Sequence, residues 1–349
     1  MKKTSIGGQA LIEGIMMRGP KRTAMAVRNP KGEIVLEAWD NSPADKKKSA
    51  VDSLTKIPIV RGVINFAMSM ITGYKCLMRS AEIAGLEEIE EEEKRRKAEK
   101  KAAKKNTDGE AVDQTEEQTE EQTETSSKET EKPTDKKESS VLMTVVSIIS
   151  FVLAIGLSVF LFIWLPTFIF EYVCRPFPLL ARNGFLRSLF EGLLKIGILV
   201  AYMACVSLMK DIRRTFQYHG AEHKTIFCYE AGLPLTVENV REQGRFHPRC
   251  GTSFLIVMVL VSVFIGFFIT TEIVALRVAI KLLLLPITMG IGYEFIKLAG
   301  KHDNVVTRVL SAPGLLMQRI TVLEPTDDMI ECAIASVKEV IPEDGSDTI

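Results

Sequence analysis

Four long apolar segments dominate the hydropathy pattern of the second half of the chain. They cover residues 141–165, 185–209, 253–270 and 273–295. Each reaches or approaches the roughly 18 to 20 residues that a helix needs to cross a bilayer. The pattern therefore predicts a mainly α, polytopic membrane protein with four transmembrane helices, the last two of which form a hairpin around residues 271–272.

Charged residues interrupt two of these segments. The second contains Arg187, Glu191 and Lys195, and the last two of these have the i, i+4 spacing of a helical ion pair. The fourth contains Arg277 and Lys281 near its start. Because the segments carry few charges and show no evident inverted repeat, a transporter is the least favoured of the functions considered below.

Shorter hydrophobic periods near the N-terminus predict a small α+β region. Residues 23–39 are typical of one β-hairpin, since two alternating segments flank the turn sequence NPKG. The preceding residues 1–22 are rich in glycine, which allows tight turns or close backbone approach. In that segment Glu13 and Arg18 either pair with each other or face a site. Residues 59–85 predict an amphipathic helix, which lies on the membrane or packs on the helical bundle.

Composition divides the chain into four regions. Residues 1–86 form the cytoplasmic α+β region. Residues 87–139 form a charged linker with too few apolar side chains to build a core, and we expect it to be largely disordered. Residues 140–299 form the membrane domain. Residues 300–349 form a cytoplasmic helical tail, in which an amphipathic helix begins near Thr326.

Lysines and arginines predict the orientation of the membrane domain. The loop over residues 210–252 contains seven of them, whereas the loop after the first span contains Arg175 and Arg182. We therefore expect both termini and the 210–252 loop to be cytoplasmic. The six cysteines are scattered without paired spacing, which fits a reducing compartment. With 44 basic and 44 acidic residues the chain has no net charge, so the expected partner is the lipid bilayer and not nucleic acid.

One short stretch contains three of the four histidines of the chain. It begins HGAEHKTIFCYE at residue 219, and its first two histidines, His219 and His223, are four residues apart. A helix places both imidazoles on one face, which is a common way to bind a metal ion. Glu222 completes the pattern His-x-x-Glu-His, in which the carboxylate acts as the general base of a metal-dependent hydrolase.

A second motif, HPRC, offers further metal ligands. His247 and Cys250 have the spacing to provide a third and a fourth ligand. We expect His219, His223 and His247 to converge, with Zn²⁺ as the first candidate for a site of nitrogen and sulfur ligands and another divalent metal as the alternative. The remaining histidine, His302, is expected at the surface, with a place in the metal site as the less favoured alternative.

Four motifs together resemble the YqhQ-like family of bacterial membrane proteins. They are GGQALIEGIMMRGP at 7–20, HGAEHKTIFCYE at 219–230, HPRCGTSF at 247–254 and PGLLMQRITVLEP at 313–325. The resemblance covers nearly the whole chain except the linker. It implies a multi-pass protein of the bacterial inner membrane, in a family of unknown function for which a metal-dependent activity has been suggested, and it implies no particular substrate.

Two functions remain open at this stage. In the first, the protein is a metal-dependent membrane hydrolase in which Glu222 activates water and the substrate is a peptide bond near the bilayer or a lipid head group. In the second, the metal is structural and the protein is a scaffold or regulator, because four protein ligands leave no open position for water. Protein partners and oligomeric state do not follow from the sequence.

Overall fold

The computed structural model describes most of the chain outside the predicted linker. The described residues are 3–41, 57–85, 149–174, 176–177, 183–248, 250–271, 273–301 and 305–348. The predicted linker at 87–139 and His302 lie outside them. Contacts divide the chain into two units, one formed by Met1–Glu87 with Leu161–Ile349 and the other by Glu88–Phe160. The fold below concerns the first unit, and residues 149–160 are the described part of the second.

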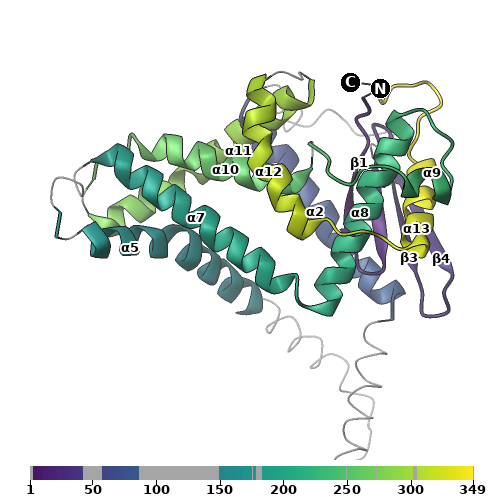
Figure 1. Cartoon of the computed structure of the whole chain (residues 1–349), viewed down its shortest axis with the longest axis horizontal. Helices are drawn as coiled ribbons and strands as arrows, with labels where there is room; N and C mark the ends of the chain where they lie inside the picture. Colours follow the sequence, from purple (N-terminus) through teal and green to yellow (C-terminus); the bar gives the residue numbers. More distant parts are fainter. Residues whose placement is uncertain are drawn as a thin grey trace, which may run out of the picture. The chain divides into compact units, whose positions relative to one another are not determined.

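An antiparallel sheet in the order β1-β2-β3-β4 forms the N-terminal region (Figure 1). Its strands are β1 (Gly7–Leu11), β2 (Gly14–Arg18), β3 (Arg22–Arg28) and β4 (Ile34–Asp40). The predicted hairpin corresponds to β3 and β4, but the expectation of a single hairpin is wrong, because residues 7–18 form two more strands. A side chain at Gly8 would come within 2.6 Å of the Met16 carbonyl oxygen. Close packing of the strands, and not a turn, therefore accounts for that glycine.

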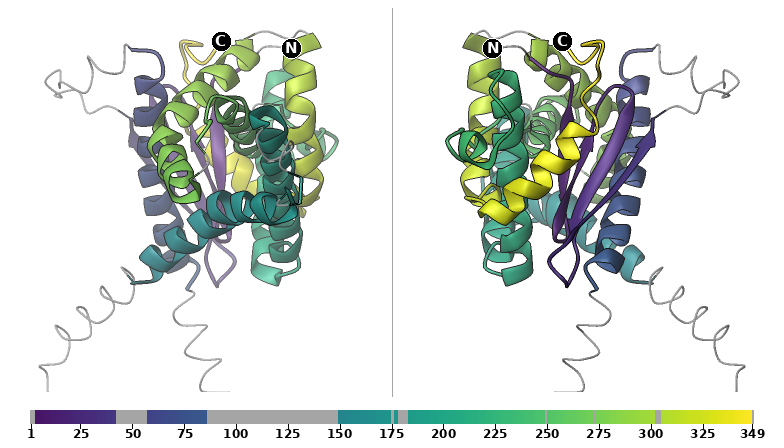
Figure 2. Two further views of the ribbon diagram at one scale, coloured as in Figure 1. Left: turned by 90° about the vertical axis from the view of Figure 1, so that its left-hand side faces the viewer. Right: turned by 90° about the vertical axis from the view of Figure 1, so that its right-hand side faces the viewer.

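Helices cover both faces of this sheet (Figure 2). Helices α8 (Lys210–Glu230) and α13 (Asp327–Lys338) pack on one face, and α2 (Val60–Ile83) packs on the other. Because side chains alternate along a strand, Met17 contributes to the core under α8 and α13, whereas its neighbour Met16 contacts the core under α2. The predicted helix over residues 59–85 is confirmed as α2.

Three helical segments are long and apolar enough to cross a membrane. The first, Ile149–Val173, includes η1 (Phe160–Trp164) and most of α5 (Leu165–Cys174). The second is α7 (Gly184–Val206). The third, Val274–Phe295, is the first part of α11 (Val274–Lys301). The segment predicted at 253–270 forms α10 (Gly251–Gly266), whose 16 residues are shorter than a full span. These helices indicate a membrane protein with three candidate spans among the described residues.

Charged side chains from α5, α7 and α11 pair inside this helical region. Glu171 accepts hydrogen bonds or ion pairs from Arg277 at 2.8 Å and from Arg187 at 3.1 Å. Glu191 pairs with Lys281 of α11, so the predicted pair with Lys195 is wrong. We call these five residues the bundle charge cluster, made of Glu171, Arg187, Glu191, Arg277 and Lys281. An opposite charge on a neighbouring helix has displaced the local i, i+4 partner.

Two further contacts connect the layers of the first unit. At its N-terminal end α2 packs on α11, where Gly62 lies against Gly290 and Arg61 pairs with Glu294. Helix α12 (Val305–Thr321) packs on α10.

The two ends of the chain lie side by side (Figure 1). Near the C-terminal end, Thr348 forms a β-bridge with Thr4.

Candidate metal centre

Three predicted ligands converge between α8 and the start of α10. The donor atoms of His219, His223 and Cys250 all lie within 4.8 Å of one another. The Nε2 atom of His219 is 3.2 Å from the Cys250 sulfur, and the two imidazole centroids are 4.5 Å apart. Helix α8 places both histidines on one face, and Cys250 is the N-cap residue of α10. We call these three residues the His/Cys cluster.

Backbone carbonyl groups orient both imidazoles of the His/Cys cluster. His219 donates from Nδ1 to the Thr321 carbonyl at 3.0 Å, and His223 donates from Nδ1 to the Arg245 carbonyl at 2.6 Å. A carbonyl oxygen can only accept, so Nδ1 carries the proton of each neutral ring, and the lone pair of that ring is on Nε2. Metal-binding histidines are oriented in this way, by a hydrogen bond from the nitrogen that does not bind the metal.

The donor set of the His/Cys cluster fits zinc. Zinc binds imidazole nitrogen at about 2.0–2.1 Å and thiolate sulfur at about 2.3 Å, so two such donors in a tetrahedral shell lie about 3.5 Å apart. The 3.2 Å between His219 Nε2 and the Cys250 sulfur is close to that separation. The described cysteines Cys76, Cys205, Cys228, Cys250 and Cys332 are all free, so the Cys250 sulfur is available as a ligand.

His247 lies beside the His/Cys cluster and makes different contacts. Its ring centroid is 5.6 Å from that of His223, so the three imidazoles are neighbours. Its Nε2 atom is 3.8 Å from a carboxylate oxygen of Glu230. The side-chain amide of Gln318 fixes its backbone, accepting from the His247 amide at 2.8 Å and donating to its carbonyl at 2.7 Å. The position of His247 is therefore defined by Glu230 and Gln318.

Glu222 faces strand β1 at the edge of the same site. One of its carboxylate oxygens accepts a hydrogen bond from the Gly8 amide at 3.0 Å, and the residue is 5% exposed. Burial raises the pKa of this carboxyl group, and His219 together with the Gly8 hydrogen bond offsets only part of that shift. A cavity of about 230 Å³ lies between the two elements, lined by Glu222, the His/Cys cluster, His247 and residues 4–8.

Comparison with known proteins supports the resemblance seen in the sequence. The family model described as "Protein of unknown function (DUF1385)" matches residues 57–343. The chain is 33% identical over 341 residues to "Uncharacterized protein YqhQ" of Bacillus subtilis (strain 168), covering 96% of this chain and 92% of that protein. The chain belongs to the DUF1385 family. No solved structure matches it.

The motif PGLLMQRITVLEP frames the His/Cys cluster of this DUF1385 protein. In addition to Gln318 and Thr321, it provides Glu324, which forms ion pairs with Lys224 and Arg245. Lys224 follows His223 in the chain, and Arg245 lies just before the HPRC segment. Burial raises the pKa of Glu324, but these two ion pairs outweigh it and hold the pKa below its usual range. The supporting contacts of the His/Cys cluster involve backbone carbonyl groups and a segment far away in the sequence. The spacing of histidines and cysteines therefore does not predict them.

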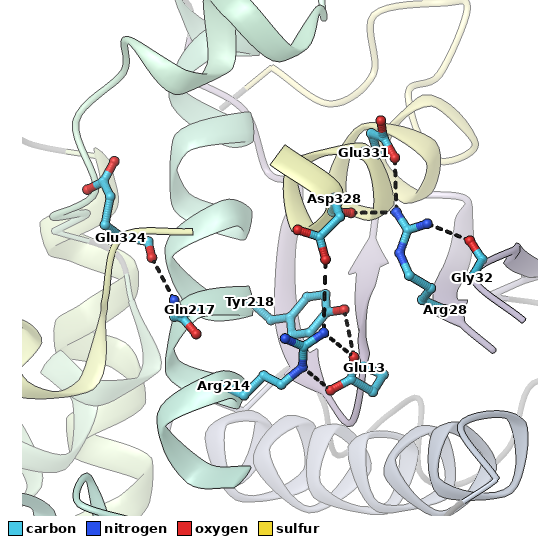
Figure 3. Close-up of polar contacts among 9 residues, drawn as sticks. All are labelled: Glu13, Arg28, Gly32, Arg214, Gln217, Tyr218, Glu324, Asp328 and Glu331. Carbon is cyan, nitrogen blue, oxygen red and sulfur yellow. Dashed lines mark hydrogen bonds and ion pairs between the residues drawn. The ribbon is translucent and has the colours of Figure 1, made fainter. Parts of the chain in front are cut away.

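Helix α8 is anchored to the sheet by the turn between β1 and β2 (Figure 3). There Glu13, with φ at 52°, forms a bidentate pair with Arg214 and lies 3.3 Å from the Tyr218 hydroxyl. Burial and the Glu13 charge raise the pKa of Tyr218. Asp328 of α13 lies 3.9 Å from Arg214 in the same group. The sequence left two alternatives for Glu13, a pair with Arg18 or a place facing a site. Glu13 instead pairs with Arg214, on the helix that carries the histidines.

Proposed function

We propose that this DUF1385 protein is a metal-dependent hydrolase that acts at the membrane surface, with Zn²⁺ as the first candidate metal. The observation that carries the proposal is the orientation of the two imidazoles. Both Nδ1 atoms are bonded to carbonyl groups, so that His219, His223 and Cys250 offer three donor atoms to one point beside a cavity. Three protein ligands with an open fourth position are typical of catalytic zinc.

The residues around the cavity provide the remaining parts of such a site. Zinc at an open site supplies Lewis-acid chemistry that polarises a carbonyl or phosphoryl oxygen. The Glu222 carboxylate then accepts the proton of the attacking water, while the Gly8 amide holds one of its oxygens in place. His247, next to the His223 ring, is positioned to donate a hydrogen bond or a proton to the leaving group.

The proposed location is the cytoplasmic face of the bacterial inner membrane. The seven lysines and arginines between residues 210 and 252 support a cytoplasmic loop there, with both chain ends on the same side. In this arrangement α10 is the fourth membrane-embedded helix, shorter than the other three and without a charged residue. A site at the cytoplasmic surface of the bilayer is accessible to a lipid head group or to a peptide bond close to the bilayer.

A structural metal site is the second candidate. It is favoured by the 5.6 Å between the His223 and His247 rings, since a small rotation of His247 away from Glu230 would add a fourth ligand and close the shell. The same metal would then hold α8, the HPRC segment and α10 together without catalysing a reaction.

Elemental analysis of the purified full-length protein tests metal binding. We expect about one zinc per chain in the wild type and a loss of metal in His223→Ala. His247→Ala distinguishes the two candidates, because it should keep its metal if three ligands suffice and lose it if His247 is the fourth ligand. Wild-type protein that is free of zinc and of other divalent metals after purification without chelators would contradict both.

Substitution of Glu222 by glutamine tests catalysis separately. Glu222→Gln keeps the size of the side chain and can still accept from Gly8, but it no longer takes a proton from water. We expect full metal content, an unchanged melting temperature and loss of complementation in a strain that lacks the gene. Normal complementation by a metal-loaded Glu222→Gln protein would leave the structural site as the better account.

A further inference from the structure

A second cavity lies on the other face of strand β1. It measures about 370 Å³ and is lined by residues of β1, β2 and α2, among them Gln9, Arg18, Ser69 and Thr72. Among the described residues, its lining contains one cationic side chain, Arg18, together with hydroxyl and amide groups, and no acidic residue. A cavity with this set of groups presents hydrogen-bond donors and positive charge without any competing carboxylate.

Arg18 differs from the neighbouring arginines in having no carboxylate partner. In the strands and α2, Arg22, Arg28, Arg61 and Arg79 each pair with a glutamate or aspartate. Within the described residues the side chain of Arg18 forms no hydrogen bond and no ion pair. Strand alternation accounts for its direction, because Arg18 lies opposite Gly7 in the sheet register and shares with Gln9 and Met16 the face that α2 covers. Its guanidinium is therefore available to a ligand in this cavity.

The two cavities share one wall. Ser5, Gly7 and Gly8 line both the Arg18 cavity and the cavity of the His/Cys cluster. Gly8 has its amide bonded to Glu222, whereas a side chain at Gly7 would meet no atom within 4 Å. Strand β1 is thus a thin partition of glycine, with Glu222 and the histidines on one side and Arg18 on the other.

Exposed apolar residues alternate along α2 with the two hydroxyl residues that line the Arg18 cavity. Met68, Met70 and Ile71 adjoin Ser69 and Thr72, and each is more than half exposed. The same helix is tied at its N-terminal end to α11, one of the candidate membrane spans. Exposed apolar groups next to a cationic cavity, on a helix attached to a membrane helix, match an amphiphilic ligand with an anionic head.

We propose that the Arg18 cavity binds the phosphate group of an anionic lipid, with its acyl chains along Met70 and Ile71. Arg18 is suited to this role because the guanidinium fork binds phosphate through two parallel hydrogen bonds. The inference goes beyond the hydrolase proposed above, because a lipid site on this face of β1 does not depend on that reaction.

Equilibrium binding of radiolabelled dihexanoyl phosphatidic acid to the full-length protein in a neutral detergent tests the proposal. We expect Arg18→Gln to weaken binding at least about tenfold, because it removes a charge-assisted hydrogen-bonded contact. Gly7→Val should weaken it similarly by filling the cavity, at a position where a side chain meets no atom within 4 Å. Arg22→Gln is the matched control, since Arg22 is on the next strand, is bound to Asp40 and Glu339, and should leave binding unchanged.

Two more measurements separate the sources of the phosphate group. Ile71→Ser should weaken binding of the lipid but leave the affinity for inorganic phosphate, measured by competition with the lipid, unchanged. Equal affinity of the wild type for the lipid and for inorganic phosphate would overturn the lipid assignment. Arg18→Lys should restore part of the affinity. Unchanged lipid binding in a folded Arg18→Gln protein would overturn the site. Lipid binding that persists in metal-free His223→Ala shows that the lipid site stands even if the hydrolase proposal fails.

Discussion

The His/Cys cluster and the bundle charge cluster are both buried and polar, but their atoms face different partners. In the bundle, Glu171 pairs with Arg187 and Arg277, and Glu191 pairs with Lys281, so each acid meets a base on another helix. In the His/Cys cluster the fixed contacts are made by the outer nitrogens of the rings, to carbonyl groups. The inner nitrogens and the thiol face one another and a cavity.

This difference separates a structural group from a candidate binding site. Buried opposite charges satisfy each other, and removing one of them leaves the other without compensation. A group of neutral donors turned toward common space is incomplete by itself, and its geometry is maintained by the surrounding backbone. Burial and polarity alone would have ranked the two clusters equally, so the direction of the lone pairs is the informative property.

The largest expected effect comes from breaking the bundle charge cluster. Lys281→Met leaves the Glu191 carboxylate buried without its partner, which typically costs about 3–5 kcal/mol. We expect poor accumulation and a strongly lowered melting temperature in detergent. The double variant Glu191→Gln/Lys281→Met removes both charges and should recover much of the loss. Equal destabilisation of the single and double variants would show that the pair does not act as a unit.

Removal of metal should affect the His/Cys cluster and leave the bundle charge cluster untouched. A ligand present at 100 times its dissociation constant stabilises a protein by about 2.7 kcal/mol. A chelator should therefore lower the melting temperature of the wild type, and readdition of zinc should restore it. His223→Ala provides the control, in which neither addition should have any effect. A chelator effect of equal size in His223→Ala would assign the metal to another site.

The contacts of Gln318 test how far the site depends on backbone support. Gln318→Leu removes the acceptor of the His247 amide, at a cost of about 1–3 kcal/mol for a buried group, whereas the His247 carbonyl keeps its hydrogen bond from the Cys250 amide. We expect a moderate loss of stability and a reduced zinc content by elemental analysis, with the bundle unaffected. Gln318→Glu can still accept from the amide but places a carboxylate oxygen against the His247 carbonyl, so it should also lower stability. Wild-type zinc content in both variants would contradict the proposed support.

The smallest effect is expected from deleting residues 104–138. Their composition cannot build a core, so neither cluster should change. We expect membrane accumulation, melting temperature and zinc content within error of the wild type. Failure of the deleted protein to accumulate would show that this segment contributes more than a connection.

Much of the candidate site follows from sequence, whereas its support does not. The sequence predicts that His219, His223 and His247 converge, with Cys250 as a fourth ligand. In the structure His219, His223 and Cys250 form the group, and His247 lies beside it. The carbonyl groups of Arg245 and Thr321 leave no trace in side-chain identity, so no motif reveals them. Distant partners such as Gln318 become visible only after folding.

The same limit applies to the fold. The β3–β4 hairpin is predictable, because its residues alternate and its turn contains proline and glycine. Strands β1 and β2 are not predictable, because Gly8 and Gly14 resemble turn residues. In the structure, carbonyl groups of the neighbouring strands leave no room for a side chain at either position. In the bundle, the local i, i+4 rule selects Lys195 for Glu191, and only the folded bundle brings Lys281 of α11 into contact with Glu191.

The bridge between Thr4 and Thr348 also determines when the site can form during synthesis. Residues 4–8 line the cavity, and Thr4 is bound to Asp347 as well as to Glu230 of α8. The residues that meet at this corner of the cavity are therefore separated by almost the whole chain, including all the apolar segments. Such long sequence separation slows folding. The contact between Thr4 and Asp347 consequently forms late, and it completes this corner of the cavity only after the apolar segments have been synthesised.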